Sequence, residues 1–402
     1  MASGSRSAFS FYFLSILSIF ATLSSTLSTE QRHACQSPTP NPLTGCPPNT
    51  LLVDPSSASN STTNSTNVFT TIQSAILSLP HDNSTSTILI LPGLYPEQLN
   101  ITRPGPLTLL SQTASPLSLS SNAVEILFRS ATNTSSFDNA FTSVLTVAPT
   151  LNSSLTGSGP TGNPVPADTP LGNSNFRAYN LNFTNGFADY SAGPSLALSV
   201  SYAQTSFYGC AFKSYQDTVY IGKWGSAYMR ACEVSGQTDF LYGFGTLWIE
   251  DSSLLLRSCG GGITAWKGTN TTYANKFGAY IHASAVRAAN SSIAEQIVGK
   301  CALGRPWNAQ HRSIFAENYL DASIIPSGYI DWSATDPRVS NWTFMAEYGD
   351  FGPGWNLTGR VEGNVTRVLN ESQWEAYSSP AKVFQYFMSG EMGNVGWIDP
   401  DA

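Results

Sequence analysis

The feature that most constrains this chain is a succession of short strand-like segments that begins at Phe176, with almost no helical pattern between them. Apolar and polar residues alternate within the segments, as in strands with one buried face. The segments are 176–183, 196–202, 206–212, 227–234, 247–256, 278–283 and 312–315. Neighbouring segments start about twenty residues apart, which is typical of a solenoid of parallel strands. Dipeptides that mark tight hairpins are nearly absent, which favours a parallel β-helix over an antiparallel sandwich.

Three regions before or between these segments are expected to differ from them. Residues 68–79 have apolar side chains at helical spacing and end before Pro80, which predicts a short helix that caps the solenoid. Residues 29–66 are rich in Pro, Ser, Thr and Asn and are predicted to be a poorly ordered, low-complexity segment. Residues 131–172 are similarly polar and are predicted to form an inserted surface loop.

Residues 1–28 resemble a secretory signal peptide, and an uncleaved membrane anchor is the alternative. Arg6 precedes an apolar run, 9–23, that is too short for a comfortable membrane span, and small residues follow it. Export also agrees with the many N-x-S/T sequons. They lie at Asn60, Asn64, Asn83, Asn100, Asn133, Asn152, Asn182, Asn270, Asn290, Asn341, Asn356, Asn364 and Asn370. A secreted, extracellular glycoprotein is therefore expected.

The six cysteines are expected to form disulfides, because an even number in an exported chain indicates bridges and no metal-binding spacing is present. The expected pairs are Cys35–Cys46, Cys210–Cys232 and Cys259–Cys301. Fifteen connectivities are formally possible, and only the second pair has a structural argument.

That argument is a shared register. Cys210 and Cys232 are 22 residues apart, and so are Asp217 and Asp239. If this interval is one coil, both pairs stack at the strand spacing of about 4.8 Å. The cysteines would then be close enough to bridge. Two carboxylates at that distance cannot both ionise easily, so one becomes an acid while the other stays available as a base or nucleophile.

Three segments around these residues resemble the signatures of pectin methylesterases, and in particular of fungal members. They are YQDTVYIG (215–222), GQTDFLYGFG (236–245) and LGRPW (303–307). The resemblance runs from about residue 68 to 385 and includes IPSGYIDW (325–332). It implies an all-β, single-stranded, right-handed parallel β-helix over 67–395 that hydrolyses the methyl esters of pectin, releases methanol and leaves pectate.

The resemblance also implies a role for each site residue. Asp239 would be the nucleophile, Asp217 the general acid and then base, Gln216 the donor to the oxyanion, and Arg305 the partner of Asp239. The expected substrate-binding residues are Trp307, Phe240, Tyr215 and Trp266. No cofactor or metal is expected, because two carboxylates, an arginine and an amide supply the chemistry.

One departure concerns the oxyanion. Pro194 stands where the family commonly has a second glutamine, and proline offers neither a side-chain donor nor a backbone N–H. Gln216 would then act alone, or Ser195 or a water would substitute. The departure keeps a non-catalytic wall-binding homologue open as an alternative. Another β-helix polysaccharide hydrolase is a further one, since close carboxylates also suit retaining glycosidases.

The net charge of the chain limits the kinds of molecule that it is expected to bind. The net charge of −7 leaves no basic patch to neutralise phosphates, which argues against nucleic acid. The expected partner is methyl-esterified homogalacturonan, with no membrane contact after signal removal. A monomer and an acidic pH optimum are expected.

Overall fold

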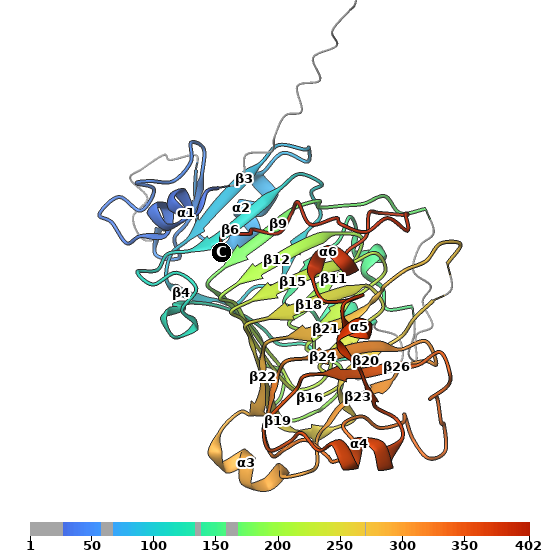
Figure 1. Ribbon diagram of the computed structural model, residues 1–402. Helices are drawn as coiled ribbons and strands as arrows, with labels where there is room; N and C mark the ends of the chain where they lie inside the picture. The colour runs from blue at the N-terminus through green and yellow to red at the C-terminus, as the bar shows by residue number, and fades with distance from the viewer. Residues whose placement is uncertain (1–26, 58–66, 133–137, 158–167, 270) are drawn as a thin grey trace, which may run out of the picture.

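The computed structural model has three sheets of parallel strands that run along one axis (Figure 1). Each coil of the chain contributes strands to the sheets in turn, and successive coils stack along the axis. The structure describes residues 27–57, 67–132, 138–157, 168–269 and 271–402. Every strand pairing between the named strands is parallel, for example Thr205 opposite Phe176 and Ala227 opposite Thr205. The parallel β-helix predicted from the sequence is confirmed.

Neighbouring strands within a sheet come from different coils of the chain. In spatial order, the large sheet is β2 (Val68–Phe69), β1 (Leu51–Val53), β3 (Ser86–Ile90), β6 (Leu107–Ser111), β9 (Phe176–Tyr179), β12 (Gln204–Tyr208), β15 (Ser226–Arg230), β18 (Thr246–Glu250), β21 (Gly278–His282), β24 (Arg312–Ala316), β26 (Phe344–Tyr348) and β27 (Arg367–Val368). The second is β25 (Tyr319–Leu320), β22 (Ala285–Ala288), β19 (Ser253–Gly260), β16 (Glu233–Thr238), β13 (Ala211–Lys213), β10 (Leu181–Asn185), β7 (Val124–Phe128) and β4 (Gly93–Tyr95). The third is β23 (Ala302–Pro306), β20 (Gly262–Trp266), β17 (Leu241–Gly243), β14 (Val219–Ile221), β11 (Leu198–Val200), β8 (Leu145–Val147) and β5 (Leu99–Ile101).

Helices lie at the ends and on the outside of the stack. They are α1 (Thr29–Gln36), α2 (Ile72–Ser78), α3 (Ser291–Ile297), α4 (Leu357–Gly363), α5 (Glu371–Trp374) and α6 (Pro380–Val383), with the 3₁₀ turns η2 (Leu119–Ser121), η3 (Asn139–Thr142) and η4 (Leu151–Ser154). None of the helices in the described ranges is long and apolar enough to cross a membrane.

Several segments predicted as one strand are two strands joined at a corner of one or two residues. Asn180, Ala231 and Asp251 occupy such corners with φ of 58°, 52° and 49°. A left-handed residue turns the chain sharply between two sheets. The alternation of apolar residues continues across the corner, so the sequence shows one unbroken strand where the structure has two.

Inward-pointing side chains stack in columns to form the core. Leu198, Val219 and Leu241 are in register on three adjacent strands of the third sheet, and all are fully buried. Each such aliphatic side chain contributes about 1.5–3 kcal/mol relative to exposure. The buried columns therefore fix the register of the strands that begin two residues after Asp217 and Asp239.

The disulfide prediction holds for two of the three pairs. Cys35–Cys46 and Cys259–Cys301 are bonded, whereas Cys210 and Cys232 are free thiols buried in the core. Each thiol lies close to a backbone carbonyl, 3.4 Å in both cases. The predicted third bridge is wrong: stacking in register brings the two cysteines close, but their sulfurs contact backbone carbonyls instead of each other.

The N-terminal predictions also need correction. Residues 27–57 are ordered: Ser28 caps α1, and β1 pairs with β3 in the large sheet. The expected helix over 68–79 starts only at Ile72, because residues 68–69 pair with β1 and Thr71 caps the helix. The predicted signal peptide lies almost wholly outside the described residues, as do the sequons at 60, 64, 133 and 270.

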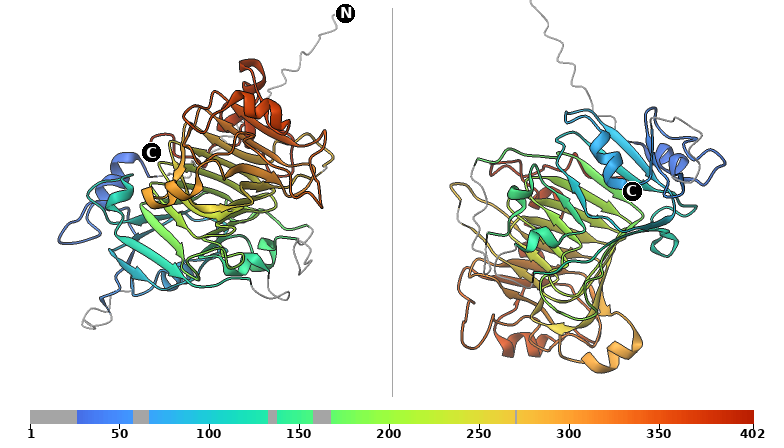
Figure 2. Two further views of the ribbon diagram at one scale, coloured as in Figure 1. Left: turned by 90° about the horizontal axis from the view of Figure 1, so that it is seen from below. Right: turned by 180° about the vertical axis from the view of Figure 1, so that it is seen from behind.

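The segment 131–172 is more than the surface loop predicted. Its residues 145–147 form β8, which pairs with β5 and β11 and is fully buried or nearly so. The turns η3 and η4 flank this strand and stand on the outside of the stack (Figure 2, green). Three residues of alternation are too few to stand out in a polar sequence.

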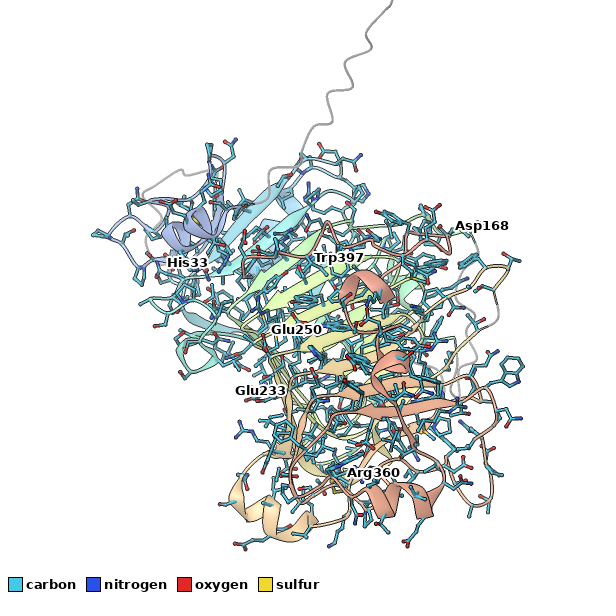
Figure 3. The ribbon with its side chains drawn as sticks, viewed as in Figure 1. His33, Asp168, Glu233, Glu250, Arg360 and Trp397 are labelled. Carbon is cyan, nitrogen blue, oxygen red and sulfur yellow. A yellow bond between two sulfur atoms is a disulfide. The ribbon has the colours of Figure 1, made fainter. Side chains whose placement is uncertain are left out.

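The outer face of the large sheet is sealed by the end of the chain. Tyr179, Tyr208, Tyr228, Trp248 and Tyr280 form one apolar cluster along successive strands. Residues from the last part of the chain, Trp374, Phe384 and Trp397, belong to the same cluster, and Trp397 is labelled over this sheet in Figure 3. The third sheet has no such cover at its carboxylate pair.

Candidate active site

A pocket of about 200 Å³ lies beside the third sheet and contains most of the predicted site. It brings together Asp217, Asp239, Gln216, Arg305 and Trp307. Its other lining residues are Asn139, Tyr242, Ala265 and Trp332.

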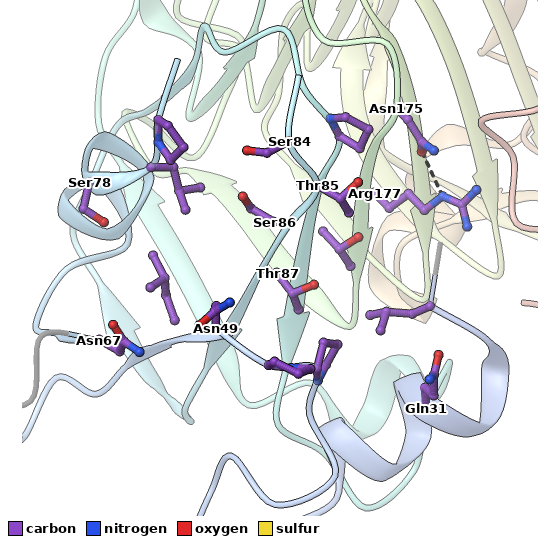
Figure 4. Close-up of a pocket in the computed structure, with 18 residues that line it drawn as sticks. Gln31, Asn49, Asn67, Ser78, Ser84, Thr85, Ser86, Thr87, Asn175 and Arg177 are labelled. Carbon is purple, nitrogen blue, oxygen red and sulfur yellow. Dashed lines mark hydrogen bonds between the residues drawn. The ribbon is translucent and has the colours of Figure 1, made fainter. Parts of the chain in front are cut away.

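A larger cavity, about 700 Å³, lies between the N-terminal segment and the first coils (Figure 4). Its lining is mainly Ser, Thr, Asn, Pro and Leu, and it contains no carboxylate, histidine or cysteine. Its one charged residue, Arg177, donates its Nε to Asn175 Oδ1 at 2.9 Å. Because the larger cavity has no carboxylate or imidazole to act as acid or base or to activate its hydroxyls, the smaller pocket is the candidate active site.

The two carboxylates occupy equivalent positions in adjacent coils. Asp217 and Asp239 each precede a strand by two residues, and those strands pair Val219 with Leu241. Both aspartates have left-handed backbone, with φ of 60° and 46°. Non-glycine residues in this conformation cluster at functional sites, where surrounding structure offsets the strain.

Arg305 lies two coils after Asp239 along the solenoid and contacts its carboxylate. Its Nε is 3.0 Å from Asp239 Oδ1 and its Nη2 is 2.6 Å from Oδ2. The backbone N–H of Gly262 also donates to Oδ1 at 3.0 Å. The face of Trp332 lies 4.0 Å from the guanidinium carbon. These donors complement a negatively charged carboxylate and fix its direction.

Gly261 shows how closely this pair is packed. A Cβ at this position would lie 2.5 Å from Asp239 Oδ1 and 2.8 Å from the Arg305 guanidinium. The residue also has φ of 64°, which glycine adopts without strain. Any side chain here would push the ion pair apart.

Asp217 has the opposite environment. It is 8 % exposed and has no cationic partner in direct contact; the amide Nδ2 of Asn139 reaches its Oδ2 at 3.3 Å. Burial, and then the charge of Asp239, raise the pKa of Asp217 well above its usual value, while Arg305 lowers it in part. The protonated form is therefore favoured at pH values where an ordinary aspartate is ionised.

Gln216 is oriented by a neighbouring loop. The hydroxyl of Ser191 donates to Gln216 Oε1 at 2.8 Å. The side-chain carbonyl is thereby occupied, and the amide NH₂ is the group left to donate into the pocket.

Residues 167–386 match a family model described as pectinesterase. The chain belongs to the pectinesterase family. It is 28 % identical over 320 residues to a probable pectinesterase A from Aspergillus niger, covering 77 % of this chain and 84 % of that protein. It spans only 42 % and 39 % of the length of two plant relatives that it matches.

Solved pectin methylesterases share the fold of this pectinesterase. The enzyme from Aspergillus niger matches with a TM-score of 0.61 and 22 % identity, covering 89 % of this chain and 98 % of that one. A pectin methylesterase mutant in complex with a hexasaccharide matches with a TM-score of 0.60 and 21 % identity, covering 83 % and 96 %.

Three residues expected to bind substrate in this pectinesterase lie elsewhere. Phe240 and Trp266 are fully buried in the core, and Trp266 Nε1 donates to the carbonyl of Gly245 at 3.1 Å. Neither exposes a ring face to a sugar, so direct stacking is wrong for both. Tyr215 is partly exposed but lies outside the pocket, with Arg257 stacked on its ring at 3.7 Å.

Four lining residues were not predicted, and one of them, Ala265, has no functional group in its side chain. Trp332 lies in the segment IPSGYIDW, which resembles the family but gave no site residue. Tyr242 lies in the second signature segment but was not assigned to the site. Asn139 belongs to a polar stretch with no motif, so no sequence signal could have found it.

The candidate site has no metal-binding character. The described part of the chain contains no group of three or more His, Cys, Asp or Glu side chains that could hold a metal ion. Within the pocket itself the acidic residues are Asp217 and Asp239, and Asp239 is already paired with Arg305.

Proposed function

We propose that this pectinesterase hydrolyses the methyl esters of galacturonosyl residues in pectin, with Asp239 as nucleophile and Asp217 as acid and base. The observation that carries the proposal is the contrast between the two carboxylates. Asp239 is ion-paired and directed by Arg305, whereas burial raises the pKa of Asp217. The raised pKa assigns Asp217 as the acid, and the two hydrogen bonds from Arg305 suit Asp239 to the role of carboxylate nucleophile.

The first half of the reaction forms an acyl-enzyme. An oxygen of the Asp239 carboxylate attacks the ester carbonyl carbon, and the carbonyl oxygen becomes an oxyanion that accepts a hydrogen bond from Gln216. The intermediate then collapses, the bond to the methoxy group breaks, and Asp217 gives its proton to the departing oxygen. Methanol leaves, and the galacturonosyl carbonyl remains joined to Asp239 as an anhydride.

The second half restores the enzyme. Asp217, now a carboxylate, takes a proton from water as the water oxygen attacks the anhydride. The bond to Asp239 breaks, the galacturonosyl group leaves as a carboxylic acid, and it then loses its proton to solvent to become the free carboxylate. Asp217 is again protonated and Asp239 again ionised, so no cofactor is consumed.

The pocket walls suit a sugar chain whose carboxyls are esterified. Trp307 is partly exposed, packs 5.6 Å from Tyr242, and borders the pocket with Trp332. Aromatic faces of this kind stack on the apolar faces of sugars. A relative solved with a hexasaccharide supports an oligosaccharide-binding cleft. We extend this to methyl-esterified homogalacturonan as the substrate, bound by a monomer.

Secretion fits this substrate. Seven of the nine sequon asparagines in the described ranges are exposed, whereas Asn100 and Asn182 are partly buried. Exposure is what a glycan requires. We propose a secreted glycoprotein that acts outside the cell, with residues 1–28 removed and 67–395 forming the esterase domain.

The test is methanol release from highly methylated pectin, measured for wild type, Asp239→Asn and Asp251→Asn. Asp251 is the matched control, because it is also an aspartate with left-handed backbone but lies on an exposed corner. We expect Asp239→Asn to lose at least about 1,000-fold in kcat, while Asp251→Asn stays close to wild type. A folded wild type that binds pectin without releasing methanol would contradict the proposal and favour a binding protein.

A further inference from the structure

The pocket contains a second amide that the sequence did not reveal. Asn139 stands at the start of η3 and reaches Asp217 Oδ2 with its Nδ2 at 3.3 Å. It enters from one side of the carboxylate pair, because its segment leads into β8, whereas Arg305 on β23 enters from the other. The turn that carries Asn139 contacts the coil of Pro194 through Thr142, which accepts from the backbone N–H of Leu196.

Asn139 is held rigidly. The preceding residue, Asp138, is 1 % exposed and accepts hydrogen bonds from the backbone N–H of Ala140 and from Thr156. On its other side, Thr142 donates to the backbone carbonyl of Asn139 at 2.8 Å and accepts from the N–H of Leu196 at 3.0 Å. These contacts fix η3 against the coil beneath it, as preorganised catalysis requires.

The other group suggested at this position points elsewhere. The hydroxyl of Ser195 is 2.9 Å from that of Ser214, is buried, and does not line the pocket. Tyr242 does line it, is 3 % exposed, and interacts with the side chain of Asn139. The Asn139 amide therefore contacts both an aromatic wall of the pocket and the Asp217 carboxylate.

We propose that Asn139 is a further catalytic residue that donates a hydrogen bond to the ester oxygen as it becomes an oxyanion. Its NH₂ group has two hydrogens, so it can contact Asp217 Oδ2 with one and donate to the substrate with the other. Together with the amide of Gln216 it gives the developing charge two donors. This role rests on the proposed ester hydrolysis.

The role also connects the two halves of the site. A donor that touches both the acid and the oxyanion fixes the carbonyl of the ester relative to the proton that the methoxy group receives. The insertion between β7 and β8 would then supply an essential group rather than a surface feature. Sequence position gave no indication of this, because Asn139 and Asp217 are 78 residues apart.

The experiment measures kcat and KM for methanol release across pH, with Asn139→Ala, Asn139→Asp and Leu151→Ala. Leu151 is the control, because it lies exposed on η4 of the same insertion. We expect Asn139→Ala to lower the maximal kcat roughly 100-fold with little change in KM, and Leu151→Ala to match wild type. Asn139→Asp preserves shape but removes the donor, so we expect a loss at least as large.

The pH profile separates this role from one confined to Asp217. If Asn139 only tuned the acid, Asn139→Ala would move the alkaline limb of the rate to higher pH and leave the maximal kcat unchanged, which would overturn the proposal. Near-wild-type kcat in Asn139→Asp would overturn it as well, and that variant also covers the case in which Asn139→Ala fails to fold. Inactive wild type would instead overturn the ester hydrolysis itself, and this inference with it.

Discussion

Two arginine–carboxylate pairs in this pectinesterase have almost the same geometry and opposite settings. In the pocket, Arg305 contacts Asp239 at 3.0 and 2.6 Å. At the far end of the solenoid, Arg360 contacts Glu347 at 2.7 and 3.0 Å, close to α4 (Figure 3). The first pair is partly exposed, with side chains 20 % and 10 % accessible, whereas both side chains of the second are fully buried.

The difference lies in the remaining donors of each guanidinium. Arg360 also donates to the backbone carbonyls of Ile325, Pro326 and Gly354, so it ties three chain segments together. Arg305 instead stacks on Trp332 and faces the pocket. The same ion pair is therefore structural where backbone carbonyls take the other N–H groups, and functional where those groups are left toward a substrate.

The largest effect is expected at the buried pair. Arg360→Gln leaves Glu347 buried without its counter-ion, and we expect a loss of about 3–5 kcal/mol in the free energy of unfolding. Chemical denaturation monitored by circular dichroism measures this. Catalytic rate per folded molecule should be unchanged, because Arg360 does not contact the pocket. A variant that folds normally but loses activity would contradict the distinction.

Arg305→Gln should show the reverse. We expect kcat to fall about 100-fold or more, because Asp239 loses the charge that orients it. The free energy of unfolding should fall by less than for Arg360→Gln, because this pair keeps some contact with solvent whereas the Arg360–Glu347 pair has none. Methanol-release kinetics and denaturation on the same preparation test both statements. Destabilisation as large as that of Arg360→Gln would show that the two pairs are not functionally distinct.

The residual activity of Arg305→Gln should have a shifted pH profile. Asp217 must be protonated to release methanol, so activity falls as pH rises through its raised pKa. Arg305 lowers the pKa of Asp217, and its removal makes protonation easier. We therefore expect the alkaline limb of kcat/KM to move to higher pH than in wild type. A limb that moves to lower pH would show that Asp217 is not the acid.

The smallest effect is expected on the sealed face of the large sheet. The carboxylate of Glu250, 3.9 Å away, raises the pKa of His282 above its usual value, and the hydrogen-bonded carboxylate of Glu317 adds to this. The folded state thus favours protonated His282, so its contribution is full below about pH 6.5 and is lost as pH rises through the raised pKa. We expect less than about 1 kcal/mol.

Thermal midpoints between about pH 5 and 9 test this contribution. Wild type should lose stability relative to His282→Gln across this range, whereas His81→Gln, on an exposed turn, should follow wild type. Parallel curves for wild type and His282→Gln would show that His282 does not contribute to the pH dependence of stability.

The sequence predicted the parts of this molecule that repeat. The interval from Asp217 to Asp239 is one coil, so residue spacing translated directly into stacking, and the Arg305 contact followed from a family motif. Prediction failed where one coil depends on another without a repeat. Asn139 reaches Asp217 from a non-repeating insertion, and the corner at Asn180 is invisible because alternation continues through it.

Spacing also misled in one instance, because proximity is not the same as bonding geometry. Cys210 and Cys232 satisfy the same register as the aspartates, yet they remain thiols. Phe240 and Trp266 show a similar limit: an aromatic residue next to a catalytic motif points inward or outward according to its strand face. The sequence alone did not show that Phe240 and Trp266 point into the core.

The unbridged cysteines provide a built-in reporter of how the catalytic coils open. Burial raises the pKa of Cys210 to about 12, so the native thiol hardly reacts with alkylating reagents. Cys210 and Cys232 precede Asp217 and Asp239 by seven residues each and lie at the start of the same coils. Modification of these two sulfurs, the free thiols of a chain whose other four cysteines are bridged, would time the transient exposure of the coils that hold the two carboxylates.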